Sequence, residues 1–144
     1  MNLSVGTSAG SQLMPVLSQL VRLLRQLDAP DRPSLVAMAI LRRLDREGAG
    51  RITDIARAER ASQPGITQLV GRLERSSLVR RVQDPNDGRG VLVELTDGGR
   101  NLLAETQAHH VSTLDMLLDR LDDADRATIV AALPALTRLT QEAP

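Results

Sequence analysis

The most informative residues of this chain lie at positions 84–90 and read Asp-Pro-Asn-Asp-Gly-Arg-Gly. Apolar, β-branched runs flank this polar segment, a pattern that predicts a β-hairpin. Asp and Asn side chains bond to backbone amides, Pro fixes φ and Gly admits positive φ, so these residues suit a turn. Arg89 would stand near the tip, with Gly90 leaving room for another surface. An arginine on a projecting loop suits the narrow minor groove of DNA, where the negative potential is enhanced.

The segment just before the hairpin predicts a helix over residues 62–75. Ser62 can cap the free amides of its first turn, and Pro64 falls within that turn, where no intrahelical donor is lost. An apolar stripe at helical spacing would be buried, and it comprises Ile66, Leu69, Val70 and Leu73. The other faces carry a glycine and polar or basic side chains: Gln63, Thr67, Gln68, Gly71, Arg72 and Arg75.

A shorter helix is predicted over residues 54–59, with Thr53 as its cap and with Ile55 and Ala56 facing inward. Residues 58–61 would form the turn that leads to the next helix. A helix, a short turn, a second helix and a hairpin with a basic tip together indicate a winged helix-turn-helix. In that arrangement the second helix enters the major groove and reads base edges.

These segments resemble the MarR-type (multiple-antibiotic-resistance regulator) transcription factors, which are small homodimeric winged-helix proteins. The resemblance covers residues 52–103 and rests on several short motifs in combination. The motifs are Asp54-Ile55-Ala56, Ser62-Gln63-Pro64 with Ile66-Thr67, Leu69-Val70 with Leu73-Glu74, Leu78-Val79-Arg80-Arg81, Asp84-Pro85-Asn86-Asp87-Gly88-Arg89, Val91-Leu92-Val93, Leu95-Thr96 and Gly99-Arg100. The resemblance implies a repressor or activator of nearby promoters, and many members release DNA when a small, often aromatic or phenolic, ligand binds.

The chain departs from the family pattern in three ways. Ser76 and Ser77 stand where members often end the recognition helix with Gly, and Gln68 stands where many members carry Arg. The aromatic residues that usually line the effector pocket are missing. Aliphatic and Arg side chains would have to line such a pocket instead. They would come from residues 13–24, 35–46 and 102–113.

The predicted DNA contacts come from the second helix and the hairpin. Gln63, Thr67 and Gln68 can donate to or accept from base edges. Arg89 is the strongest single candidate, and we expect Asp87 to orient it by a charge-assisted hydrogen bond. The full set is Ser62, Gln63, Pro64, Thr67, Gln68, Arg72, Arg75, Arg80, Asp87, Gly88, Arg89 and Gly90.

Arg72 and Arg75, near the end of this helix, have two interpretations. They would contact phosphates, which position a protein on DNA without reading its sequence. Alternatively they would pair within the chain, with Glu74 and Asp87 as partners.

The distribution of charge agrees with DNA binding, although the net charge of the chain is zero. All 18 basic residues are arginine. Residues 60–90 hold six arginines against three acids, whereas residues 101–144 hold three arginines against seven acids. The basic excess therefore lies around the proposed groove-binding elements, as binding through phosphates requires.

Composition sets the outer limits. A chain of 144 residues has the size of one domain, and its core must be aliphatic because Phe, Tyr and Trp are absent. Their absence also removes the stacking platforms that modules for single-stranded nucleic acid and RNA use. No Cys is present, which excludes thiol chemistry and thiolate metal sites. We recognise no signal peptide and no apolar run of membrane-spanning length, so we expect a cytoplasmic protein without membrane contact.

Two helices are predicted before the winged-helix motifs. Residues 11–27 carry a broad apolar stripe, as expected of a helix buried between two subunits. A helix over residues 34–47 would stop at Gly48 in a left-handed conformation. The residues of this second helix that should face inward are Leu35, Met38, Leu41 and Leu44.

Two further helices are predicted after the hairpin. Thr96 would cap a long one over about residues 97–120, and Asp122 or Asp123 would start the last. The chain would consist of three regions: a mobile tail (1–10), a dimerisation region (11–33 and 101–144) and a winged helix-turn-helix region (34–100). The expected fold class is mainly α, an α+β winged helix with about six helices and a two- to three-stranded antiparallel wing, assembled as a helical dimer.

The function expected from these features is transcriptional regulation through sequence-specific binding of double-stranded DNA. The protein would repress nearby genes as a homodimer on a pseudo-palindromic operator, and a small hydrophobic ligand would release it. The alternative is a winged-helix dimer that binds protein partners, which the zero net charge and Gln68 leave open.

No enzyme, cofactor or metal site is expected. No catalytic set of side chains can be assembled from the sequence. His109 and His110 are adjacent, so they point in different directions on a helix. The acidic stretch at residues 115–125 fits a solvated face that leads into a helix N-terminus.

Overall fold

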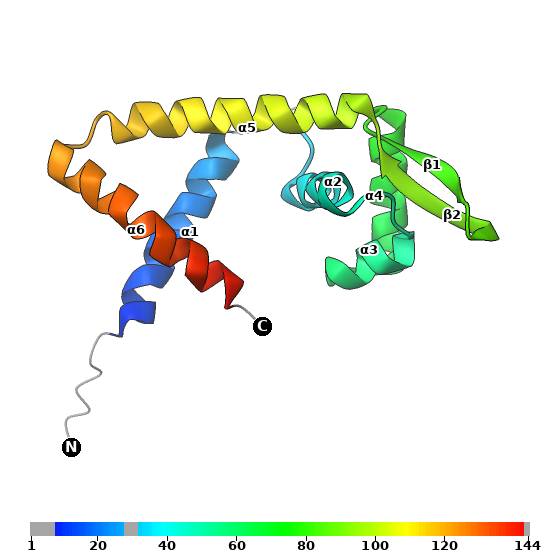
Figure 1. Ribbon diagram of the computed structural model, residues 1–144, viewed down its shortest axis with the longest axis horizontal. Helices are drawn as coiled ribbons and strands as arrows, with labels where there is room; N and C mark the ends of the chain where they lie inside the picture. The colour runs from blue at the N-terminus through cyan, green and yellow to red at the C-terminus, as the bar shows by residue number, and fades with distance from the viewer. Residues whose placement is uncertain (1–7, 28–31, 143–144) are drawn as a thin grey trace, which may run out of the picture. The chain divides into compact units, whose positions relative to one another are not determined.

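The computed structural model describes residues 8–27 and 32–142 of the chain. These residues form six α-helices and one two-stranded antiparallel sheet (Figure 1). In chain order the elements are α1 (Ala9–Leu27), α2 (Leu35–Glu47), α3 (Ile52–Ala58), α4 (Gln63–Arg75), β1 (Val79–Asp84), β2 (Asp87–Leu95), α5 (Asp97–Leu118) and α6 (Asp123–Gln141). The predicted fold class, mainly helical with an antiparallel wing, is confirmed. No helix among these is both long and apolar enough to cross a bilayer.

One aliphatic core joins α2, α3, α4 and the hairpin of β1 and β2. Burying a Val, Leu or Ile side chain of this kind stabilises the fold by about 1.5–3 kcal/mol. The predicted inward faces of α3 and α4 are confirmed, except that Leu69 is only partly buried. The core residues are Ala37, Met38, Ile40, Leu41, Leu44, Ile55, Ala56, Ile66, Val70, Leu73, Val79, Val93 and Leu95.

The inward face of α2 differs from the prediction at one position. Leu35 is 41% exposed, whereas the other three predicted residues are buried. The prediction for Leu35 was wrong because this residue is the first of α2 and precedes the part of the helix that packs in the core. Ala37 and Ile40, which were not predicted to face inward, are buried instead. Gly48 ends the helix with φ 84°, which is positive as predicted. Its ψ of −166° lies outside the left-handed α region, in a conformation that glycine alone adopts readily.

Side-chain caps mark the starts of α2, α4, α5 and α6. Each cap accepts a hydrogen bond from the backbone N–H three residues further on, which satisfies one of the free donors of the first turn. The caps at Ser62, Thr96 and Asp122 were predicted from the sequence. The caps are Ser34, Ser62, Thr96 and Asp122.

The predicted cap of α3 is wrong. The helix begins at Ile52, so Thr53 lies inside its first turn, and the N-cap residue Arg51 makes no side-chain cap. Gly50, just before, is paired with Val93 of β2 through two backbone hydrogen bonds of 3.0 and 2.8 Å. Arg51 is the one residue between this bridge and the helix, and its guanidinium has no acceptor for the free helical amides.

The hairpin of β1 and β2 is the predicted wing. Its base is buried, with Val79 opposite Leu95, and the register shifts between Gln83 and Asp84 near the turn. The bridge at Gly50 adds a single pair to the two strands, in agreement with the expectation of two to three strands. Figure 1 shows the turn of this hairpin projecting beyond α3 and α4.

Neither α1 nor α6 contains a buried residue. α1 begins at Ala9, with the Ser8 hydroxyl oxygen accepting from the Ser11 N–H at 3.2 Å. Residues 9 and 10 therefore belong to the helix rather than to the predicted tail, and residues 1–7 of that tail lie outside the described part. The chain divides into two compact units, one ending at Gln107 and one beginning at Ala108, and α5 runs through the boundary.

The turn after α4 is formed without the glycine that the family often has there. Ser77 has φ 59°, a left-handed conformation that costs a residue with a side chain about 1–2 kcal/mol. Its N–H donates to the Glu74 carbonyl at 2.9 Å, which closes the turn. Ser77→Gly should therefore raise the free energy of unfolding by about 1 kcal/mol, measured by urea denaturation. Ser76→Gly, at φ −85°, is the matched control, and equal stabilisation by both changes would contradict this account.

Candidate nucleic-acid interface

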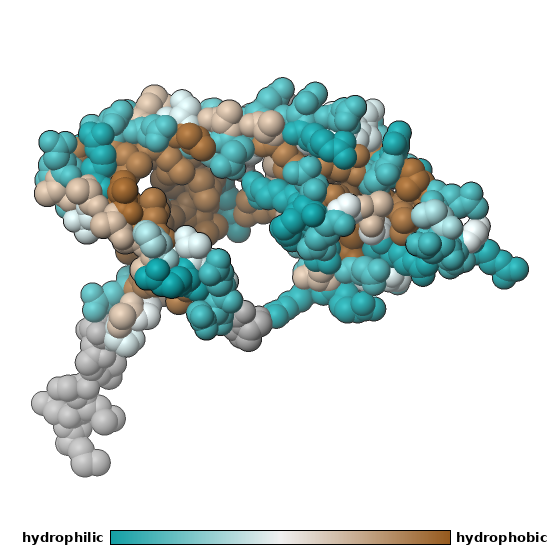
Figure 2. Space-filling model, viewed as in Figure 1, coloured by the Kyte–Doolittle hydropathy of each residue, from teal (hydrophilic) through white to brown (hydrophobic). Residues whose placement is uncertain are grey.

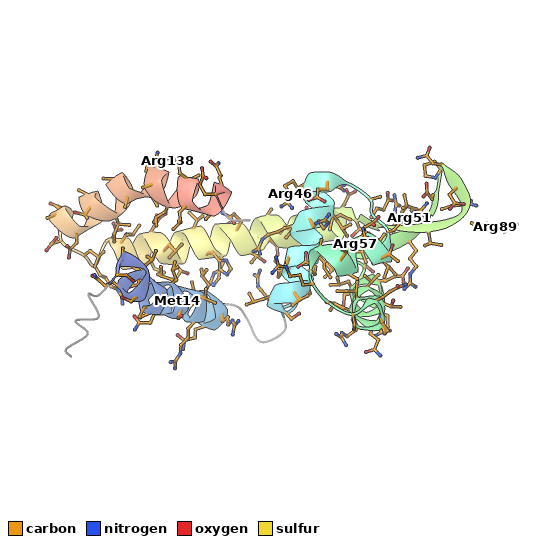
Figure 3. The ribbon with its side chains drawn as sticks, turned by 90° about the horizontal axis from the view of Figure 1, so that it is seen from below. Met14, Arg46, Arg51, Arg57, Arg89 and Arg138 are labelled. Carbon is orange, nitrogen blue, oxygen red and sulfur yellow. The ribbon has the colours of Figure 1, made fainter. Side chains whose placement is uncertain are left out.

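Hydrogen bonds within the chain fix the turn of the hairpin. Asp84 Oδ1 accepts from the Asn86 N–H at 2.9 Å, and Asp87 Oδ1 accepts from the Arg89 N–H at 3.2 Å. These are Asx-type bonds, in which an acidic side chain replaces a backbone acceptor. The turn thus has a defined shape, and Figure 3 shows Arg89 at its tip.

The expectation that the Asp87 carboxylate binds and orients the Arg89 guanidinium was wrong. Within the described part of the chain, the exposed Arg89 guanidinium has no ion pair or hydrogen bond. The Asp87 carboxylate accepts instead from the Arg89 backbone and, at 3.3 Å, from the guanidinium of Arg51. Arg51 lies 36 residues before Asp87 in the chain, and reasoning from neighbouring residues did not consider this arginine as a partner.

Arg51 is the site residue that the sequence analysis missed. Its Nη2 donates to Asp84 Oδ2 at 2.6 Å, and only 7% of the Asp84 side chain is exposed. The hydrogen bond from Arg51 lowers the pKa of Asp84 below its usual value, and the same contact raises the pKa of Arg51. The pair is therefore ionised at neutral pH. No periodic pattern links residues this far apart, so the sequence held no local signal for it.

Gly90 accommodates this ion pair rather than leaving open space. A Cβ at Gly90 would lie 3.0 Å from Asp84 Cβ and 3.3 Å from Arg51 Nη2. The room that we expected for another surface is thus filled by the protein's own side chains. At Gly88 an added Cβ would meet nothing within 4 Å, so the open approach lies there.

Helix α4 has one buried side and one outward side. Ile66, Val70 and Leu73 are buried. Successive residues of an α-helix are turned by about 100°, because 3.6 residues make one turn. The positions farthest from the core are therefore Pro64, Gln68, Gly71 and Arg75.

The other predicted residues of α4 lie on its flanks or at its start. The Thr67 hydroxyl donates to the Gln63 carbonyl at 2.8 Å, so it is satisfied within the helix, while its oxygen can still accept. Ser62 is committed to its capping bond. Arg72 lies on the flank that faces the start of α2, beside Ser34.

Neither arginine of α4 makes the internal pair that was considered for it. The Glu74 carboxylate pairs with Arg81 of β1 at 3.0 Å, and the Asp87 carboxylate pairs with Arg51. Arg72 and Arg75 are exposed. Their guanidinium groups are thus available at the surface for phosphate.

Arg80 occupies a different environment from the other predicted arginines. It pairs with Glu94, directly opposite on β2, and its side chain remains 68% exposed. The surface near the hairpin turn is predominantly hydrophilic (Figure 2). In the described residues, no group of three or more His, Asp and Glu side chains is arranged to hold a metal ion. The chemistry that the interface offers is hydrogen-bond donation and positive charge.

The chain is similar to transcriptional regulators in sequence and in structure. A model of the MarR family matches residues 34–91. An HTH-type transcriptional regulator of Mycobacterium bovis is 28% identical over 134 residues, which are 93% of this chain and 94% of that protein. A crystal structure from Pseudomonas aeruginosa, described as a transcriptional regulator, is 30% identical with a TM-score of 0.79, over 93% of this chain and 94% of that one.

A further solved structure has the same fold at lower identity. It is BpsR of Bordetella bronchiseptica, whose DNA binding is regulated by 6-hydroxynicotinic acid. The two chains are 24% identical with a TM-score of 0.66, and the match covers 100% of each. The family match spans α2 to the hairpin turn, where the winged helix-turn-helix was found, and the likeness to solved structures extends over the remaining helices. This chain therefore belongs to the MarR family of transcriptional regulators.

Proposed function

We propose that this protein regulates transcription by sequence-specific binding of double-stranded DNA. The observation that carries the proposal is that two exposed, donor-rich elements, the outward face of α4 and the tip of the hairpin, share one rigid core. Gln68 on α4 can bond to base edges in the major groove, and Arg75 can contact phosphate. Arg89 would enter the adjacent minor groove.

The surface chemistry of these elements favours DNA over a protein partner. Between residues 62 and 95, Val91 is the one large apolar side chain with a strongly exposed fraction, 51%. Protein interfaces are anchored by buried aromatic and apolar side chains. Residues 62–95 offer arginine and amide groups instead, which suit phosphates and bases.

The remaining helices would build a homodimer. α1 and α6 each carry five large apolar side chains that are 40% or more exposed. Helix faces of this kind are covered in a stable protein, and a second copy of the chain would cover them. In this proposal residues 11–33 and 101–144 form the dimerisation region and residues 34–100 bind DNA. Two copies of α4 would enter successive major grooves, about 34–36 Å apart, on a pseudo-palindromic operator, and so block transcription of nearby genes.

A small ligand would release the DNA. Between α2 and α5 lies a hollow of about 330 Å³. All of its lining residues except Arg100 come from two of the three ranges expected to form a pocket, and Arg42 and Arg100 could face an anionic group. BpsR, which has the same fold, responds to an aromatic acid. The lining residues are Arg42, Asp45, Arg100, Leu103, Ala104 and Gln107.

The proposal is tested by selecting bound fragments from random duplexes and sequencing them. A recovered motif with two inverted half-sites is the expected result. The affinity for that motif is then measured by fluorescence anisotropy, with a scrambled duplex as control. Equal affinity for the motif and the scrambled duplex would refute sequence-specific regulation.

Removing the side chain at the hairpin tip should weaken binding. We expect Arg89→Ala to cost about 1–3 kcal/mol of binding free energy and to reduce the slope of log K against log salt concentration by about 1. Arg138→Ala removes the same charge from α6, which belongs to the other compact unit, and is the control. Wild-type operator affinity in the Arg89 variant would refute the assignment of the wing.

Gly71 should mark the point at which α4 comes closest to the bases. It lies inside the helix, where glycine costs about 0.5–1 kcal/mol relative to alanine, and an added Cβ would meet only Arg75, at 3.8 Å. Gly71→Ala should therefore raise the unfolding free energy by that amount and yet lower operator affinity. A variant that is stabilised but binds with unchanged affinity would show that the methyl group does not meet DNA.

A charge on the apolar face of α6 should disrupt the dimer. Leu133 is 51% exposed, so Leu133→Glu removes little packing from the single chain. We expect the variant to sediment as a monomer and to lose most of its operator affinity, because each half-site is then bound separately. Ala131→Glu, about 160° away around the helix, is the matched control and should remain dimeric. A monomeric wild-type protein would overturn the dimer proposal.

A further inference from the structure

We infer that Arg51 is a positioning residue for DNA binding, which holds the outer half of the wing in a fixed relation to α3 and α4. The inference deepens the proposed function and rests on it. Arg51 is the N-cap residue of α3, and its guanidinium reaches Asp84 and Asp87 at the turn of the hairpin. Figure 3 shows Arg51 and Arg89 along the same hairpin, with Arg89 at the tip.

The outer half of the hairpin lacks other anchors in the core. Val79, Val93 and Leu95 hold its base, and the backbone bridge to Gly50 lies at Val93. Between residues 80 and 92 no side chain belongs to the core. A two-stranded ribbon without a packed face is marginally stable in water. The contacts of Arg51 thus fall where the ribbon would otherwise have no tertiary support.

The ion pair is built into the fold rather than lying loose on the surface. Asp84 is nearly buried, and its second oxygen accepts from the Asn86 N–H, so both carboxylate oxygens are used. Gly90 provides the space, because any larger residue would push against both Asp84 and Arg51. A buried carboxylate that is paired and fully hydrogen-bonded is strongly oriented.

The consequence for DNA binding concerns geometry. α3 and α4 share the core, so fixing the turn to the start of α3 also fixes it relative to α4. Arg89 and the outward face of α4 must reach adjacent grooves at the same time. A wing that is already held at that spacing does not have to be ordered when DNA binds, which lowers the entropic cost of binding.

Arg51 could instead act by contacting a phosphate directly, and the two roles predict opposite signs for one variant. Asp84→Asn removes a negative charge near DNA. By electrostatics alone, this variant would bind DNA as tightly as wild type or more tightly. If Arg51 positions the wing, the same variant loses the ion pair and binds more weakly, although no cation has been removed.

The experiment measures operator affinity for the full-length Asp84→Asn variant and a matched control. We expect about tenfold weaker binding, the size of effect of one charge-assisted hydrogen bond. Glu94→Gln removes an acid from the same hairpin, frees Arg80 and should bind equally well or more tightly. Affinity of Asp84→Asn equal to or above that of wild type would overturn the inference.

A second variant and a footprint keep the test independent of folding and of charge. Gly90→Ala changes no charge but inserts a Cβ against the pair, and it should also weaken binding. Hydroxyl-radical footprints should lose protection at the outer minor-groove positions, while the central half-site contacts remain. Uniform loss of protection, or wild-type affinity in Gly90→Ala, would refute a positioning role. A wild-type protein that binds no duplex would refute the proposed function instead.

Discussion

The aliphatic core shared by the helices and the hairpin is the constraint on which the rest of the structure depends. Val93, completely buried at the base of the wing, belongs to the same cluster as Val70 of α4 and Ile40 of α2. Because closely packed interiors do not deform continuously, the core fixes the base of the hairpin relative to α4, and the ion pair of Arg51 extends this to the turn. The core contains no aromatic residue, so its rigidity comes from branched aliphatic side chains in defined rotamers.

Local chemistry made much of this fold predictable. Ser62, Thr96 and Asp122 act as caps because hydroxyl and carboxyl oxygens accept bonds from free helical amides in any protein. The stripe of α4 and the turn of the hairpin followed from equally local rules. Thr53 and Leu35 were misjudged because tertiary contacts, and not the residues themselves, decide where those helices begin.

The candidate site was predicted less completely than the fold, and charge is the reason. Sequence gives the inventory of arginines and acids, but only tertiary structure decides which of them pair. Arg51 pairs with Asp84, and Arg81 pairs with Glu74. Arg75 and Arg89 make no ion pair within the residues that the structure describes. A chain with zero net charge can thus present a basic surface, because most of its acids near the wing are already neutralised by partners.

The lack of Phe, Tyr, Trp and Cys has a spectroscopic consequence. The protein contributes almost no absorption or fluorescence in the near ultraviolet. In a mixture without an aromatic ligand, circular dichroism between about 260 and 300 nm would therefore come from the nucleic acid alone, and intrinsic fluorescence in a mixture with such a ligand would come from the ligand alone. A change in the conformation of the duplex and the occupancy of a pocket could each be observed directly, without labels and without subtracting a protein signal.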